Sequence, residues 1–227
     1  MNNKIIDSLK GGLIVSCQAL QGNPLRAPTH MAAMAQAAEL GGAVGIRANG
    51  VEDITEIKKR VNIPIIGINK TAATPEFPYI TPSFEHAKEI ADLGVEIIAL
   101  DATLRPRPDG TDINELIYRI KNELNVLVMA DIATFEEGVN AAKAGVDIVA
   151  TTLSGYTTYS PITEGPDLEL VTRLKETIDV PIIAEGRYTS PQLLAEGIKA
   201  GAHAVVIGKS ITNIMFNTKR FITEAGL

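Results

Sequence analysis

Eight apolar runs in this chain each stop abruptly at a polar residue or a glycine. Longer segments with helical patterning separate the runs, so the sequence predicts alternating buried strands and helices. This alternation is typical of a closed parallel barrel, in which the carboxyl ends of the strands converge on one site. The residues at which the runs stop are therefore the first candidates for that site: Gln18, Arg47, Lys70, Asp101, Asp131, Thr152, Glu185 and Gly208.

The length of the chain agrees with one barrel. Its 227 residues, 45% of them hydrophobic, are enough for one sizeable core, and no linker or low-complexity tract divides them. We expect residues 1–227 to form a single TIM (β/α)8 barrel domain, with a short helix near 2–9 that plugs its amino-terminal mouth. An open doubly wound sheet has the same local pattern, but eight strand signals without a nucleotide-binding glycine motif favour the closed form.

An internal repeat supports this architecture. Four short segments, each ending in glycine, precede an apolar run, and we expect these glycines to end helices in the left-handed backbone conformation: Gly41, Gly94, Gly145 and Gly201. Such repeated helix–glycine–strand units imply right-handed crossovers. Expected strands lie near 11–17, 43–47, 63–69, 95–101, 126–131, 146–151, 180–185 and 203–208. Expected helices lie near 29–40, 51–60, 83–93, 112–123, 134–144, 167–177, 190–200 and 214–225, several after a capping residue such as Ser83, Asp112, Thr134 or Ser190.

Composition excludes several classes of function. The net charge of −6 argues against broad electrostatic binding to nucleic acid. No apolar run reaches 18 residues, and the first residues lack the apolar core of a signal peptide, so no membrane association is expected. The one cysteine, Cys17, has no partner for an internal disulfide and suits a reducing cytoplasm. Cys17 is interpreted as a small buried hydrophobe rather than a nucleophile.

Lys70 is the candidate base of the site. At an ordinary pKa of about 10.4 almost every lysine is protonated at pH 7, but burial or a neighbouring cation such as Arg47 would lower the pKa. The alternative is a surface lysine or one paired with a carboxylate. Glu185 is the candidate partner that relays a proton or holds a substrate hydroxyl, and the alternative there is a structural ion pair with Arg47 or Arg187.

Other strand ends supply candidate substrate contacts. Asp131 is one of them, whereas Asp101 serves equally well as a structural carboxylate for neighbouring loops. The amide of Gln18 or the hydroxyl of Ser16 can donate to an oxyanion or a sugar hydroxyl, and Thr152 is a further candidate at its strand end.

The last two strand ends predict a phosphate site. In barrels, the loops after strands seven and eight commonly bind phosphate together with a short extra helix, which residues 209–212 resemble. The alternative is an ordinary turn. The candidate phosphate-binding residues are Gly186, Arg187, Gly208, Lys209 and Ser210. The three histidines are scattered, so no metal site is expected, and no nicotinamide or flavin fingerprint is present. After these exclusions, the function that the sequence favours is acid–base chemistry on a small phosphorylated compound.

A resemblance to a known family covers nearly the whole chain. The sequence is similar to the N-acylglucosamine-6-phosphate 2-epimerases, also called N-acetylmannosamine-6-phosphate 2-epimerases. The matching motifs, in order, are Gly12-Leu13-Ile14-Val15-Ser16-Cys17-Gln18, Gly45-Ile46-Arg47-Ala48, Gly67-Ile68-Asn69-Lys70, Tyr79-Ile80-Thr81-Pro82, Leu100-Asp101-Ala102-Thr103, Asp131-Ile132-Ala133-Thr134, Thr151-Thr152-Leu153-Ser154-Gly155-Tyr156-Thr157 and Ala184-Glu185-Gly186-Arg187.

The resemblance implies a TIM barrel, often a homodimer, without a dissociable cofactor. It implies interconversion of N-acetylmannosamine 6-phosphate and N-acetylglucosamine 6-phosphate, with Lys70 as base and Glu185 as its partner. The resemblance likewise implies that Gln18, Arg47 and Asp131 contact the substrate. One departure concerns phosphate: many relatives have arginine where this chain has Asn213, so Lys209 or Arg187 is expected to replace it.

Two rival functions remain open at this stage. Lys70 can also be read as the Schiff-base nucleophile of an aldolase acting on a phosphorylated sugar, because barrel aldolases carry a lysine at a strand end. A non-catalytic phosphosugar-binding sensor would need the same pocket but no turnover.

Overall fold

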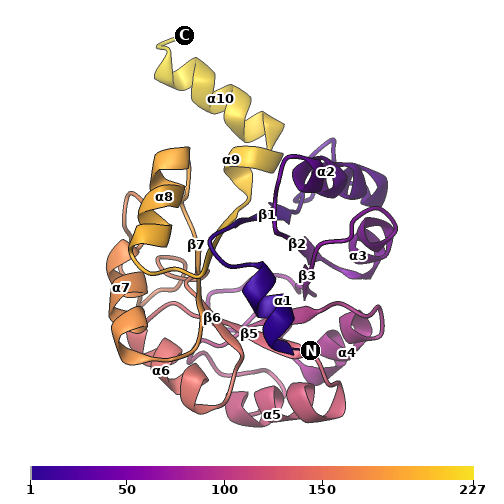
Figure 1. The fold of residues 1–227 in the computed structure, drawn as a ribbon, viewed down its shortest axis with the longest axis vertical. Coiled ribbons are helices and arrows are strands. Elements are labelled where there is room, and N and C mark those ends of the chain that lie inside the picture. The colour runs from indigo at the N-terminus through magenta and orange to yellow at the C-terminus, as the bar shows by residue number, and fades with distance from the viewer. Residues whose placement is uncertain (1) are drawn as a thin grey trace.

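Eight parallel strands form a closed barrel in the order β1 to β8 (Figure 1). The computed structural model describes residues 2–227. The strands are β1 Leu13–Cys17, β2 Gly45–Asn49, β3 Ile65–Ile68, β4 Ile97–Asp101, β5 Leu127–Asp131, β6 Ile148–Ala150, β7 Ile182–Glu185 and β8 Ala204–Ile207. All eight expected strands are confirmed, and the closed ring excludes the open sheet.

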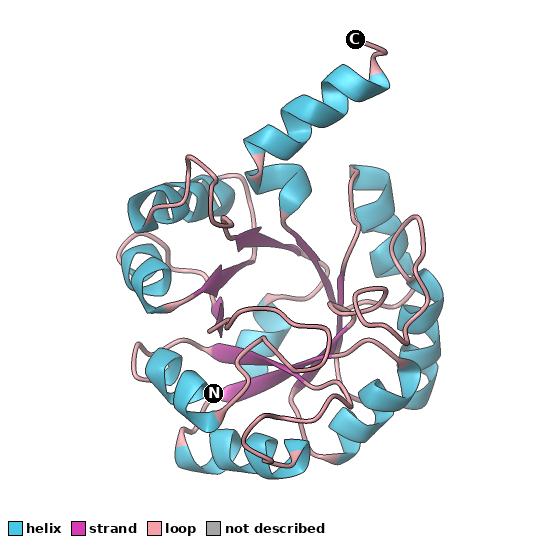
Figure 2. Ribbon diagram, turned by 180° about the vertical axis from the view of Figure 1, so that it is seen from behind, coloured by secondary structure: helices cyan, strands magenta, loops and turns pink. Residues whose placement is uncertain are grey.

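The helices alternate with the strands, and most of them surround the ring (Figure 2). They are α1 Asn2–Ser8, α2 Pro28–Leu40, α3 Val51–Lys58, α4 Phe84–Ala91, α5 Ile113–Glu123, α6 Phe135–Lys143, α7 Leu168–Thr177, α8 Pro191–Lys199, α9 Lys209–Thr212 and α10 Ile214–Glu224. The expected caps are confirmed, because four side chains each accept a hydrogen bond from the first turn: Ser83, Asp112, Thr134 and Ser190.

Apolar side chains fill the barrel on both sides of the strands. One buried cluster lies between the strands and the outer helices, and a second fills the interior of the ring. Helix α1 closes the amino-terminal end of this interior: Ile5 and Ile6 pack against the inner cluster, and His203 Nε2 lies 2.8 Å from the Ile6 carbonyl. Figure 1 shows α1 across the centre of the ring, as the sequence predicts. The carboxyl ends therefore form the open mouth.

One of the four glycine predictions is wrong. Gly94, Gly145 and Gly201 adopt the left-handed backbone with φ of 74°, 85° and 107°. Gly41 instead keeps a right-handed φ of −78°, and Gly42 takes the positive value of 95°. Two consecutive glycines let the α2 backbone continue for one more residue before it turns, which moves the left-handed position to the second of them.

Helix α10 extends away from the barrel (Figures 1 and 2). It follows β8, where the repeating pattern places the last helix of the outer ring. However, none of its side chains is buried. Its apolar residues are exposed: Ile214, Met215, Phe216, Phe221 and Ile222. No helix among residues 2–227 is long and apolar enough to cross a membrane.

Candidate active site

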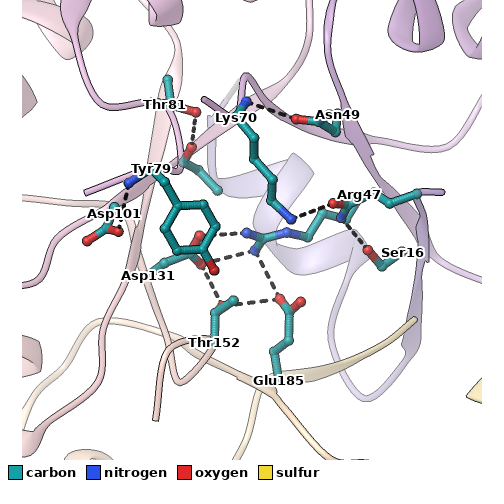
Figure 3. Close-up of polar contacts among 12 residues, drawn as sticks. Ser16, Arg47, Asn49, Lys70, Tyr79, Thr81, Asp101, Asp131, Thr152 and Glu185 are labelled. Carbon is teal, nitrogen blue, oxygen red and sulfur yellow. Dashed lines mark hydrogen bonds and ion pairs between the residues drawn. The ribbon is translucent and has the colours of Figure 1, made fainter. Parts of the chain in front are cut away.

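A network of polar side chains fills the mouth of the barrel (Figure 3). Arg47 of β2 lies at its centre, with only 1% of its side chain exposed. Its Nη1 and Nη2 donate to the two carboxylate oxygens of Asp131 over 3.0 and 2.5 Å, and Nη1 also donates to Glu185 Oε2 over 2.9 Å. The strands bring together charges that lie 84 and 138 residues apart in sequence.

Lys70 approaches this network from the end of β3. Its backbone N–H donates to Asn49 Oδ1 over 2.9 Å, which holds the residue beside the end of β2. Its Nζ donates to Gln18 Oε1 over 2.7 Å, and Gln18 Nε2 lies 2.6 Å from Ser16 Oγ. Burial and, secondarily, the charge of Arg47 lower the pKa of Lys70 from 10.5 to about 8. The amine is thus half-buried, directed into the mouth and more easily deprotonated than an ordinary lysine.

Thr152 links the two carboxylates. Its hydroxyl lies 2.6 Å from Asp131 Oδ1 and 3.1 Å from Glu185 Oε2. Burial raises the pKa of Glu185, although Arg47 acts in the opposite direction. Burial alone lowers the pKa of Arg47, but Asp131 and Glu185 outweigh it and raise that pKa, so the guanidinium stays charged. The site therefore holds one permanent cation between two carboxylates, with Lys70 beside it.

The candidates from strands seven and eight lie close together at their loops. Gly208 is packed so tightly against Ser16 that an added Cβ would approach the Ser16 Cβ to 3.3 Å. The hydroxyl of Ser210 donates to the Tyr188 carbonyl over 3.1 Å, while the side chain of Lys209 is exposed. Gly186 has a φ of 110°. Asn213 accepts a hydrogen bond from Phe216 N as the cap of α10.

Arg187 has a contact pattern that the sequence does not indicate. Its three side-chain nitrogens donate to the carbonyls of Gly165 and Ser154 and to Thr163 Oγ1, over 2.7 to 2.9 Å. The guanidinium thereby holds the loop between β6 and α7. A role in phosphate binding requires it to add the ligand to these contacts, so this role stays a prediction.

The structure also supports the interpretations of Asp101 as a structural carboxylate and of Cys17 as a small buried hydrophobe. Asp101 is fully buried and accepts hydrogen bonds from Arg105, Thr103 and the Tyr79 backbone, which supports its role as a structural carboxylate. Cys17 is buried, and its burial raises its pKa to about 12, so it is poorly suited to act as a nucleophile.

Two residues of the mouth were not selected from the sequence. Asn49 holds the Lys70 backbone; it lies two residues beyond Arg47, where the second apolar run was expected to stop, because the observed strand β2 continues to Asn49. Tyr79 lies beside Lys70 in Figure 3. It comes from an irregular loop, where no periodicity indicates which residues turn inward. Residues 2–227 contain no cluster of three or more His, Cys, Asp or Glu side chains placed to hold a metal ion.

This arrangement at the carboxyl ends of the strands defines the class of protein: a TIM barrel whose mouth holds a cluster of ionisable side chains suited to acid–base chemistry. Residues 31–226 match the family model described as "Putative N-acetylmannosamine-6-phosphate epimerase". The chain belongs to this N-acetylmannosamine-6-phosphate epimerase family.

Individual relatives agree over almost the full length. A protein of Caldanaerobacter subterraneus with the name "Putative N-acetylmannosamine-6-phosphate 2-epimerase" is 52% identical over 224 residues, which cover 98% of this chain and 94% of that protein. One from Clostridioides difficile is 50% identical over 218 residues, covering 96% and 97%. The solved N-acetylmannosamine-6-phosphate 2-epimerase of Clostridium perfringens superposes with a TM-score of 0.93 at 45% identity, covering 97% of this chain and 96% of that one.

Proposed function

We propose that this enzyme interconverts N-acetylmannosamine 6-phosphate and N-acetylglucosamine 6-phosphate, in the breakdown of sialic acid and aminosugars, by removing and returning the proton on C2. The observation that carries this mechanism is the half-buried Lys70 amine, whose pKa is lowered to about 8, close enough to Glu185 for their charges to interact. In the open-chain sugar, C2 is next to the C1 aldehyde, so its hydrogen is weakly acidic. A neutral amine at Lys70 is a suitable base for it.

The positions of the two catalytic candidates suit an inversion. In a closed ring of eight strands, β3 and β7 stand opposite each other. Lys70 follows β3 and Glu185 ends β7, so a substrate between them would present one face of C2 to each. Lys70 removes the proton from one face, and Glu185 returns a proton to the other. In the reverse direction the two residues exchange these roles.

The pKa shifts support this exchange of roles. The pKa of Lys70 is lowered and that of Glu185 is raised, so the two values approach each other. The state with neutral lysine and protonated glutamate then lies closer in free energy to the state with both charged. A reversible epimerase needs both states, because each direction of the reaction begins from one and ends in the other.

The remaining candidates are assigned to binding. Gln18, Ser16, Arg47, Asp131 and Thr152 contact the open-chain sugar or hold the two catalytic side chains in place. Phosphate is assigned to the loops after β7 and β8, through the backbone N–H groups of Gly186 and Gly208 and the side chains of Arg187, Lys209 and Ser210, where Arg187 adds the ligand to its present contacts. Lys209 or Arg187 takes the part of the arginine that relatives carry at position 213.

Deuterium labelling tests this function. We expect purified protein incubated with N-acetylmannosamine 6-phosphate in deuterium oxide to form N-acetylglucosamine 6-phosphate that carries deuterium at C2. Proton NMR would show the product without its C2 proton signal, because the returned proton comes from solvent-equilibrated groups. A product that retains hydrogen at C2 would contradict the scheme, and absence of any product would contradict the function.

We also propose that the protein acts as a homodimer in the cytoplasm. A single free cysteine suits a reducing compartment. Two helices whose side chains are incompletely covered by the rest of the chain, α10 and α8, support the dimer. Helix α10 has no buried side chain, and in α8 only Gly197 is buried, so the apolar side chains of α8 are incompletely covered on the side where an eighth outer helix is expected. The α10 helix of a second copy would cover this face, and the exchange would be reciprocal.

A charge on α10 tests the dimer. We expect Phe221→Glu to convert the dimer into a monomer, because Phe221 is 69% exposed in one chain and would be buried by the second copy. Light scattering coupled to size exclusion would show the molar mass fall by half. Tyr118→Glu on α5, where the tyrosine is 65% exposed, is the matched control and leaves the mass unchanged. A wild-type protein with the mass of one chain would contradict the proposal.

A further inference from the structure

The loop after β3 folds back and places Tyr79 next to Lys70. Lys70 and Ile80 form an antiparallel bridge. The N–H of Thr71 donates to the Tyr79 carbonyl over 3.0 Å, and the N–H of Thr81 donates to the Asn69 carbonyl over 3.1 Å. Residues near 70 and 80, ten positions apart in sequence, therefore lie side by side at the mouth.

The backbone of Tyr79 is anchored on both sides. Its N–H donates to the buried carboxylate of Asp101 over 3.3 Å. Thr81 is fully buried with a φ of 46°, and its hydroxyl accepts from Asn69 N over 3.1 Å and donates to the Ala99 carbonyl over 2.7 Å. A threonine is rarely found in this left-handed region, and here two hydrogen bonds hold it there. These hydrogen bonds thus fix the loop at the mouth.

The ring of Tyr79 lies near two cations. Its centroid is 6.0 Å from Lys70 Nζ and 5.8 Å from Arg105 Cζ. The ring also packs against the inner apolar cluster of the barrel. Figure 3 shows its hydroxyl directed toward Asp131 and the guanidinium of Arg47. Within residues 2–227, the phenol oxygen makes no hydrogen bond. It is not completely shut off from solvent.

Most other donors of the mouth are already engaged, and the Nε of Arg47, which has no partner among residues 2–227, is shut off from solvent. Both Nη atoms of Arg47 donate to Asp131, and Nη1 donates to Glu185 as well. The Gln18 amide donates to Ser16 and accepts from Lys70. By contrast, the Tyr79 hydroxyl has a proton to donate and no acceptor. Burial and the charges of Asp131 and Asp101 raise the pKa of Tyr79 to about 12, so the hydroxyl keeps this proton at neutral pH.

We propose that Tyr79 is a further catalytic residue, whose hydroxyl donates a hydrogen bond to the substrate oxygen that becomes negatively charged when Lys70 removes the C2 proton. The assignment rests on the proposed function. The C2 proton passes to Lys70 Nζ, the electrons of the C2–H bond form the C1–C2 double bond, and the carbonyl electrons move onto O1. Tyr79 stabilises this charge and transfers no proton. The aromatic ring of Tyr79 keeps water from the Lys70 amine.

Tyr79→Phe separates the hydroxyl from the ring. We expect this variant to lower kcat by about 100-fold with little change in KM, because a donor to a developing oxyanion acts mainly in the transition state. Deuterium incorporation at C2 should slow by the same factor. The pH at which kcat/KM reaches half its maximum should not move, because the phenylalanine ring still covers Lys70. Tyr118→Phe, on the exposed face of α5, is the control and keeps wild-type kinetics.

The outcomes separate this assignment from the proposed function. If Tyr79→Phe keeps the wild-type kcat, the assignment of Tyr79 is overturned, whereas the proposed function is unaffected. A raised KM with kcat preserved would place the hydroxyl on a non-reacting part of the sugar and would overturn it as well. A shift in the pH dependence with unchanged kcat at its plateau would mean that Tyr79 acts only through Lys70, which again overturns it. Wild-type protein that forms no C2-deuterated product overturns the proposed function and this assignment with it.

Discussion

Lys70→Met is expected to lower kcat for the epimerisation by about 10³- to 10⁴-fold, because it removes the base and leaves no other amine in its place. Methionine has a similar length and no charge, so it fits a half-buried position at the end of β3 without a strain on the fold. The measurement is product formation followed by NMR, with circular dichroism and thermal unfolding to establish that the barrel is intact. Turnover near the wild-type rate would remove Lys70 from the mechanism.

A matched lysine provides the control. Lys88→Met on α4 removes a side chain that is 55% exposed and paired only with Asp92, and it should leave kcat unchanged. Borohydride treatment of wild-type protein with substrate distinguishes the base from an aldolase nucleophile. A reduced covalent adduct at Lys70 would favour the aldolase, whereas a proton-abstracting amine forms none.

The lowered pKa of Lys70 also predicts how wild-type activity depends on pH. The scheme begins with neutral Lys70 and protonated Glu185, so the pair must hold one proton between them. We expect kcat/KM to be level just below pH 8 and to fall about tenfold per pH unit above it, because the proton lost with a pKa of about 8 is then no longer available to Glu185. At pH 7 about one amine in ten is neutral, compared with about one in 3,000 at a pKa of 10.5. A profile that keeps rising above pH 8 would contradict the exchange of roles between Lys70 and Glu185.

Arg47→Met is expected to lower the free energy of unfolding by about 3–5 kcal/mol. The side chains of Arg47 and Asp131 are 1% and 0% exposed, and the variant leaves the buried carboxylate with Thr152 as its remaining hydrogen-bond donor. Glu185 loses its 2.9 Å partner as well. Urea denaturation of the two proteins measures the difference. A loss below about 1 kcal/mol would show that the ion pairs contribute little to stability.

Two further variants identify the cause of that loss. The double variant Arg47→Met with Asp131→Leu should recover much of the stability, because it removes the fully buried carboxylate that the single variant leaves without its cation. Arg119→Met breaks an exposed pair with Glu123, whose side chains are 34% and 51% exposed, and should cost less than about 1 kcal/mol. If the double variant is no more stable than the single one, the loss comes from packing rather than from an uncompensated carboxylate.

The elements of the barrel follow from local signals in the sequence. Ser83, Asp112, Thr134 and Ser190 begin helices as expected because a capping hydrogen bond spans only two or three residues. Strand ends were predicted within a few residues, and Lys70 and Glu185 were found at two of them. Gly41 shows the limit of such local rules, since two neighbouring glycines permit either to take the left-handed conformation, and the path of the chain into β2 selects Gly42.

Contacts between residues on distant strands could not be predicted from such local signals. Arg187 illustrates this, because its position after β7 fits a phosphate ligand, yet the structure uses all three of its side-chain nitrogens to hold the 154–165 loop. Tyr79 is a residue that the sequence did not single out for the site. The loop that carries it has no periodic pattern, so the sequence does not indicate that its ring turns inward over Lys70.

The sequence by itself therefore determined the alternation of strands and helices, the closed barrel and the strand ends at which the reactive side chains lie, since apolar periodicity and capping act over a few residues. Only the tertiary structure decided which of these side chains meet. Closing the ring places Arg47 between Asp131 and Glu185, brings Lys70 to Gln18 and leaves the hydroxyl of Tyr79 unpaired in the described protein. The pKa values of the site depend on these burials and on charges from distant strands, which no local segment contains.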